Sequence, residues 1–105
     1  MRAFMVFSTA PNRVVAGRIA RAVLNKRLAA CVHLAPTGES HYWWKGKLEH
    51  AREIILTFKT SKKALPLLVR TLKKVHPYET PEILVVRMDD GHPAYLKWLI
   101  SETGA

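Results

Sequence analysis

The chain has 105 residues, and its 17 Lys and Arg residues outnumber 8 Asp and Glu residues for a net charge of +9. That length suits one domain with its own core, so we expect residues 1–105 to form a single domain. No apolar run approaches the roughly 20 residues that span a bilayer, and residues 1–8 lack a secretory cleavage pattern. We therefore expect a cytoplasmic protein with no membrane partner.

The first half of the chain predicts a strand, a helix and a second, interrupted strand. Residues 1–8 are apolar, and Asn12 is suited as the N-cap of the helix that follows. Apolar residues then recur at the spacing of one helix face, namely Ala16, Ile19, Ala20, Val23, Leu24 and Leu28. Residues 30–35 predict a second strand, which resumes over residues 40–44 before a bend at residues 45–47.

The second half repeats this order. Residues 52–60 predict a third strand with Ile54, Leu56 and Phe58 on one face. Ser61 is suited to cap a second helix. The apolar stripe of that helix is Leu65, Leu68, Leu72 and Val75. Pro77 ends the helix, and residues 83–86 predict a fourth strand. Residues 93–102 predict a short last helix.

The resulting order of elements is β-α-β-β-α-β with an additional C-terminal helix. Two split β-α-β units with right-handed crossovers predict an α+β, ferredoxin-like sandwich. In this fold two helices cover one face of a four-stranded antiparallel sheet. Residues 4–7, 54–56 and 83–86 are nevertheless apolar on both faces of their strands. Another subunit is the simplest cover for the second face.

Few side chains in the sequence point to chemistry. We find no nucleophile elbow, P-loop, dinucleotide fingerprint or paired-cysteine zinc spacing, so we expect no enzyme activity and no organic cofactor. Cys31 and His33 lie two apart on a predicted strand, so they point to the same face and together suit copper or zinc. The alternative is a core cysteine beside a hydrogen-bonded histidine. His76 follows the second helix, where it could serve as a cap.

Several segments taken together resemble the CutA family of divalent-cation tolerance proteins. They are residues 27–32 (RLAACV), 40–47 (SHYWWKGK), 59–60 (KT), 76–82 (HPYETPE) and 95–98 (YLKW), and they occur in family order. The resemblance implies a tight homotrimer with sheets inward and helices outward, and a similarity to the PII signalling proteins. It also implies copper or another divalent metal as the ligand.

The resemblance places one expected metal ligand in this chain. His76 matches the histidine of the family's His-Pro-Tyr motif, which is a proposed copper ligand in some members, and Glu79 follows in the same segment. Cys31 with His33 is the other expected pair, on the chemistry of its own residues, since His33 stands where an asparagine is commoner in the family. Ser8 and Val75 stand where those members have a further cysteine and histidine. We expect the trimer interface at the aromatic residues Tyr42, Trp43, Trp44 and Trp98.

Two alternative ligands remain open at this point. A small anionic metabolite would bind in a cleft between subunits, with the residues Glu39, Tyr42, Trp44, Lys59 and Tyr78. A nucleic acid would bind the basic residues of the two helices and their flanks, which are Arg13, Arg18, Arg21, Lys62, Lys63, Arg70, Lys73 and Lys74. We expect the nucleic acid least, because the third strand lacks the aromatic signature of an RNA-recognition module.

Overall fold

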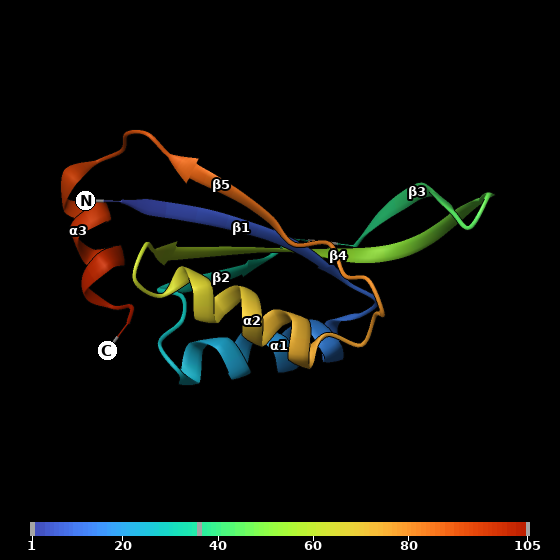
Figure 1. Ribbon diagram of the computed structural model, residues 1–105, viewed down its shortest axis with the longest axis horizontal. Helices are drawn as coiled ribbons and strands as arrows, with labels where there is room; N and C mark the ends of the chain where they lie inside the picture. The colour runs from blue at the N-terminus through green and yellow to red at the C-terminus, as the bar shows by residue number, and fades with distance from the viewer. Residues whose placement is uncertain (1, 36, 105) are drawn as a thin grey trace.

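A computed structural model describes residues 2–35 and 37–104, and Figure 1 shows the arrangement of its elements. The described residues form five strands and three helices. Their bounds are β1 Ala3–Ala10, α1 Arg13–Asn25, β2 Cys31–Leu34, β3 Gly38–Trp44, β4 Lys47–Ser61, α2 Leu65–Val75, β5 Leu84–Met88 and α3 Pro93–Ser101.

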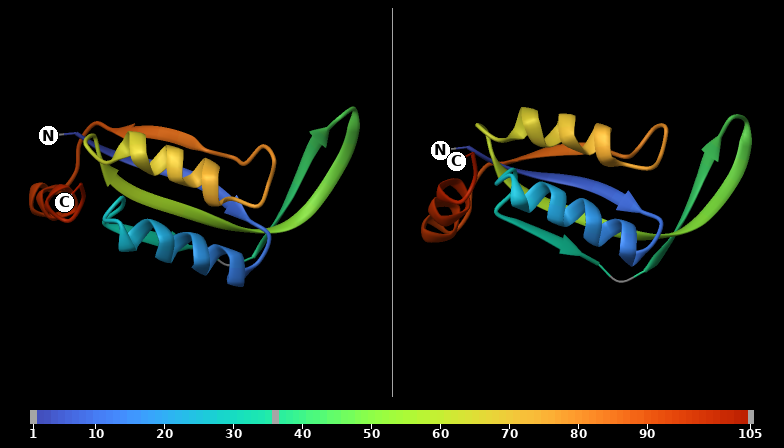
Figure 2. Two further views of the ribbon diagram at one scale, coloured as in Figure 1. Left: turned by 60° about the horizontal axis from the view of Figure 1, so that its bottom comes forward. Right: turned by 90° about the horizontal axis from the view of Figure 1, so that it is seen from below.

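The sheet has the strand order β2-β4-β1-β5, and neighbouring strands are antiparallel. Helices α1 and α2 lie side by side on one face of this sheet, as both views of Figure 2 show. This is the predicted ferredoxin-like sandwich. The strand count differs, because β3 is a separate strand that pairs only with the first half of β4.

Strand β4 is longer than the predicted residues 52–60, and it has two roles. Its second half lies between β1 and β2 in the core sheet, whereas its first half extends beyond the sheet with β3. Lys45 (φ 49°) and Gly46 (φ 79°) form the two-residue connection between β3 and β4. Positive φ at both positions is typical of the tight turn that matches the twist of a hairpin. We call this hairpin, residues 38–53, the arm (Figure 1).

The core lies between the helices and the sheet. Ile54, Leu56 and Phe58 lie on one face of β4, as predicted, and all three are buried. They pack in one cluster with residues of both helices, including Ile19 and Leu68. Full burial of one such side chain contributes about 1.5–3 kcal/mol, so this cluster holds the helices on their face of the sheet.

The two helices begin differently. The backbone N–H of Val15 donates to Oδ1 of Asn12 at 2.9 Å, so the predicted N-cap of α1 is confirmed. The predicted cap of α2 is wrong, because α2 begins after Ala64 with no side-chain cap. Ser61 instead accepts from the backbone N–H of Ala64 at 3.4 Å, which stabilises the turn before the helix.

The face of the sheet opposite the helices carries apolar side chains. Strand pairing places Leu84 beside Phe7 and Val86 beside Met5 on this face, with Ile55 beside Thr9. Ile55, Leu84 and Val86 are 43–56% exposed. We call these residues the open face of the sheet.

Candidate functional site

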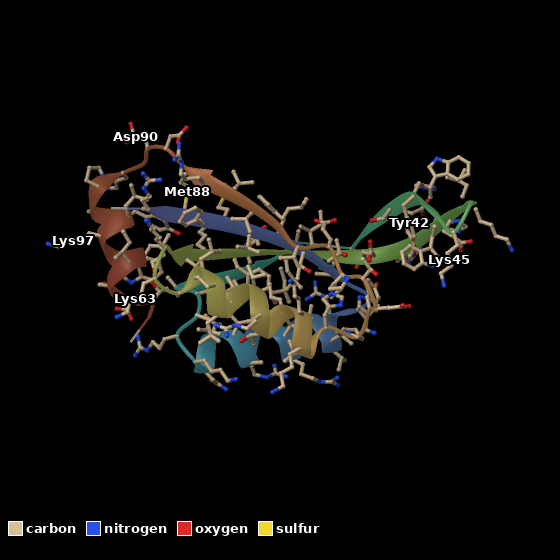
Figure 3. The ribbon with its side chains drawn as sticks, in the orientation of Figure 1. Tyr42, Lys45, Lys63, Met88, Asp90 and Lys97 are labelled. Carbon is tan, nitrogen blue, oxygen red and sulfur yellow. The ribbon has the colours of Figure 1, made fainter. Side chains whose placement is uncertain are left out.

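A hollow of about 620 Å³ lies where the arm meets the loop between α2 and β5. Residues of β1, the arm and that loop line it together. The lining residues are Thr9, Ser40, His41, Tyr42, Trp44, Glu53, Tyr78, Glu79, Thr80 and Glu82. In Figure 3 the labelled Tyr42 lies on the arm, far from Met88 and Asp90 beside α3.

The charge of the hollow is opposite to that of the chain. Glu53, Glu79 and Glu82 line it, whereas none of the described lining residues is a lysine or an arginine. The chain as a whole carries a net charge of +9. Carboxylate oxygens are the donors that hard divalent cations prefer, so the hollow suits a cation better than an anion.

Glu53 is the buried carboxylate of this hollow. It is 8% exposed, and its Oε2 accepts a hydrogen bond of 3.0 Å from the hydroxyl of Tyr78. Burial of the phenol, followed by its hydrogen bond to Glu53 and the charge of that carboxylate, raises the pKa of Tyr78 to about 12. Tyr78 therefore stays protonated at neutral pH and keeps donating to Glu53.

His76 is a structural residue in this conformation. It is 7% exposed, its Nε2 donates to the backbone carbonyl of Thr9 at 2.6 Å, and its Nδ1 accepts from the backbone N–H of Tyr78 at 3.1 Å. A carbonyl only accepts, so Nε2 carries the proton and both ring nitrogens are engaged. Binding of a metal by His76 would require one of these hydrogen bonds to break.

Cys31 and His33 lie on the same side of the sheet as the open face. Their partners in β4 are Lys59 and Thr57, and the pairing confirms that both side chains point to the same side. The Lys59 ammonium beside Cys31 donates to the hydroxyl of Tyr95 at 3.2 Å, and this hydrogen bond is the main reason that the pKa of Lys59 is raised. A metal at this pair would therefore have a fixed positive charge as its neighbour.

The structure separates the residues that were predicted to line a ligand cleft. Tyr42, Trp44 and Tyr78 meet in the hollow. Glu39 lies on the other side of the arm, and Lys59 is in the core sheet next to α3. No group of three or more His, Cys, Asp or Glu side chains within residues 2–35 and 37–104 is arranged to hold a metal ion directly.

Glu53 and Glu82 are the carboxylates of the hollow that the sequence patterns did not identify. One signal for Glu53 was available, since it directly precedes the apolar run of residues 54–56, where an ionised side chain needs a partner. The partner, Tyr78, is 25 residues further along the chain. Only the folded chain brings the two together.

The aromatic residues predicted at an interface are exposed at two ends of the molecule. Tyr42, Trp43 and Trp44 lie on the arm, and Trp43 is 73% exposed. Trp98 lies on α3, where its ring is 5.5 Å from that of Tyr95. Most basic residues of the helix layer are exposed as well. No helix in the described part of the chain is long and apolar enough to cross a membrane.

The ferredoxin-like sandwich with a long projecting hairpin and a hollow at the base of that hairpin defines a class of small α+β proteins. Comparison with known sequences identifies the family. The family model described as CutA1 divalent ion tolerance protein matches residues 4–102. The chain therefore belongs to the CutA1 family.

Relatives at similar identity come from distant organisms. The divalent-cation tolerance protein CutA of Yersinia pestis (strain Pestoides F) is 44% identical over 97 residues, which are 92% of this chain and 82% of the relative. Protein CutA of Mus musculus is 46% identical over 93 residues, 89% of this chain and 52% of the relative. The chain thus spans about half the length of the mouse protein and, likewise, of the human protein.

Solved structures of the family superimpose closely on this chain. The divalent cation tolerance protein of Thermus thermophilus has a TM-score of 0.93 at 39% identity, and the match covers 97% of this chain and 99% of that structure. CutA1 of Oryza sativa has a TM-score of 0.94 at 35% identity, covering 99% of this chain and 95% of that structure.

Proposed function

We propose that the chain acts in divalent-cation tolerance as a homotrimer that binds a hydrated divalent cation in the hollow, without catalysing a reaction. The observation that carries the proposal is the acidic lining of the hollow in a basic chain. The names of its relatives as divalent-cation tolerance proteins support the same role.

A hydrated cation fits this lining better than a directly coordinated one. The three carboxylates are not arranged as a direct ligand cluster, whereas a hollow of about 620 Å³ has room for an ion with its water. Ions such as Mg²⁺ and Mn²⁺ keep several waters and bind through one or two carboxylates. Glu79, a predicted ligand, and Glu82 line the hollow and can supply these contacts.

The proposal of a trimer is supported by the open face. Ile55, Leu84 and Val86 form an apolar surface that helices leave uncovered, and soluble monomers rarely expose large surfaces of this kind. Strand β5 also lies at the edge of the sheet, where its outer backbone groups invite pairing with another chain. Closed association of identical chains would cover both features.

Titration of Mn(II) into the purified chain tests the cation site, because Mn(II) favours oxygen ligands. We expect saturable binding that Glu79→Gln and Glu82→Gln each weaken and that the double variant abolishes. Asp89→Asn is the matched control, since Asp89 lies outside the hollow and pairs with Arg87. Equal affinity in the control and the double variant would reject the hollow as the cation site.

Light scattering tests the trimer. We expect a mass of about three times the 11.9 kDa of one chain. Ile55→Lys together with Val86→Lys introduces charges on the open face and should dissociate the assembly. Val14→Lys is the control, because Val14 is 68% exposed on α1. A monomeric parent chain, or an unchanged mass in the double variant, would contradict the proposal.

A further inference from the structure

The arm has a second face, opposite the one that faces the hollow. Strand pairing places Glu39 opposite Arg52, His41 opposite His50, and Trp43 opposite Leu48. These residues alternate with Ser40, Tyr42 and Trp44, whose side chains point toward the hollow. The second face therefore presents two adjacent histidines on a pair of hydrogen-bonded strands, with His41 at the rim of the hollow.

The two imidazoles are close and nearly parallel. The ring centroids of His41 and His50 are 5.7 Å apart with an interplanar angle of 28°. Both residues are exposed, so their rings are free to rotate toward a common point without repacking the core. Directly paired residues of antiparallel strands have Cβ atoms about 4.5–5.5 Å apart. Two nitrogens at about 2.0–2.1 Å from one metal ion are within reach of such a pair.

A carboxylate orients one of these rings. Oε1 of Glu39 lies 2.6 Å from Nε2 of His41. An ionised carboxylate only accepts, so Nε2 carries the proton and Nδ1 keeps its lone pair. Histidines that bind metals commonly donate their other N–H to a carboxylate in this way, which fixes the tautomer and raises the basicity of the ligand nitrogen. This hydrogen bond is an observation independent of the ring pair, and it prepares His41 as a ligand.

The remaining groups on this face do not compete with the histidine pair for a metal ion. No side-chain hydrogen bond of His50 occurs among residues 2–35 and 37–104. Arg52 is the cationic group on the same face, and its cross-strand partner is Glu39 rather than either histidine. Trp43 and Leu48 form the apolar neighbour pair toward the tip of the arm. Arginine, tryptophan and leucine side chains offer no lone pair that competes with imidazole for a metal ion.

We propose that His41 and His50 form a chelating site for a divalent transition metal of the Cu(II) or Ni(II) type, with Glu39 as a positioning residue. Water completes the coordination, since two protein nitrogens are available. Imidazole nitrogen suits Cu(II) and Ni(II), whereas carboxylate oxygen suits Mg(II) and Mn(II), so this site and the hollow select different ions. The proposal does not depend on the proposed function, because its ligands are not the carboxylates that would hold the cation in the hollow.

Calorimetric titration of Ni(II) into the full chain tests the proposal. We expect one ion per chain and an affinity that falls about tenfold or more in His41→Ala and in His50→Ala, because the second ligand binds intramolecularly. His92→Ala is the matched control, since His92 is also an exposed histidine, its side chain makes no cap hydrogen bond, and it belongs to neither expected metal pair. Losses as large in His92→Ala as in the arm variants would overturn the proposal, as would an unchanged affinity in either arm variant.

Two further measurements identify the ligands directly. Electron paramagnetic resonance of the Cu(II) form should show two coordinated imidazole nitrogens in the parent chain and one in His50→Ala. Glu39→Gln should lower Ni(II) affinity about 10–100-fold, the usual effect of removing such a carboxylate partner. Mn(II) binding should be unchanged in Glu39→Gln. One coordinated nitrogen in the spectrum of the parent chain would overturn the histidine site. If Glu39→Gln lost Mn(II) binding but kept the two-nitrogen Cu(II) spectrum, only the proposed cation site in the hollow would be overturned.

Discussion

The hydroxyl of Tyr78 donates a hydrogen bond of 3.0 Å to Oε2 of Glu53, which joins the loop after α2 to β4 at the base of the arm. We expect Tyr78→Phe to lower the free energy of unfolding by about 1.5–3 kcal/mol, the range for a hydrogen bond to a charged group. Urea denaturation at matched chain concentration measures this change, because association affects the midpoint.

Tyr95→Phe is the control for that variant. The Tyr95 hydroxyl takes part in a hydrogen bond as well, in which it accepts from Lys59 at 3.2 Å. Both of these side chains are partly exposed to water. We expect its loss to change the free energy of unfolding by less than about 0.5 kcal/mol. Equal destabilisation by the two substitutions would mean that the hydrogen bond to the buried carboxylate stabilises the fold no more than the exposed one does.

The raised pKa of Tyr78 makes stability depend on alkaline pH. The ordinary pKa of a tyrosine is 10.0, and the pKa of Tyr78 in the folded chain is about 12. The folded state therefore holds its proton more tightly than the unfolded state. This contribution to stability is fully present below about pH 10 and is lost as the pH rises through about 12.

Ultraviolet titration of tyrosinate measures this shift. The chain has three tyrosines, so one of three ionisation steps should come late, near pH 12. That late step should disappear in Tyr78→Phe. A Tyr78→Phe variant that retains the late step would assign it to another tyrosine and contradict the structure.

His76 should prove structural rather than a metal ligand. His76→Ala removes the donor to the Thr9 carbonyl and the acceptor for the Tyr78 N–H, both in a buried region. We expect a loss of about 1–3 kcal/mol in the free energy of unfolding, and no change in Ni(II) affinity where the variant is folded. His92→Ala is the control, since His92 is exposed and its side chain makes no cap hydrogen bond. Loss of Ni(II) binding by folded His76→Ala would show that His76 does coordinate metal.

Two buried hydroxyls in the sheet should respond to removal in opposite ways. Ser8 Oγ is fully buried, and it is the buried side-chain polar atom without a hydrogen-bond partner among the described residues. Thr60 Oγ1 is also buried but donates to the Leu28 carbonyl at 2.7 Å. We expect Ser8→Ala to be neutral or stabilising, and Thr60→Val to destabilise by about 1–3 kcal/mol because it leaves that carbonyl unpaired. Thermal or urea unfolding of both variants measures the difference, and a destabilised Ser8→Ala would refute this expectation.

Local patterns in the sequence predicted a structural feature correctly where a single short-range rule, such as helix capping or strand alternation, decides it. The N-cap at Asn12 and the buried alternation of Ile54, Leu56 and Phe58 follow from short-range rules, and both are confirmed. The length of β4 was missed. Its first residues, 47–51, are mostly polar and exposed, and they form a strand because they pair with β3.

The sequence by itself determined the order of elements, the fold class and the family, because these depend on periodicity and on motifs that are contiguous along the chain. It also indicated the need for a cover on the sheet, since strands apolar on both faces have no polar side for water. Only the tertiary structure decided which polar groups meet. Glu53 accepts a hydrogen bond from Tyr78, which lies 25 residues further along the chain. Both ring nitrogens of His76 form hydrogen bonds with backbone groups. Such pairings depend on where strands cross and how loops return, which no local pattern specifies.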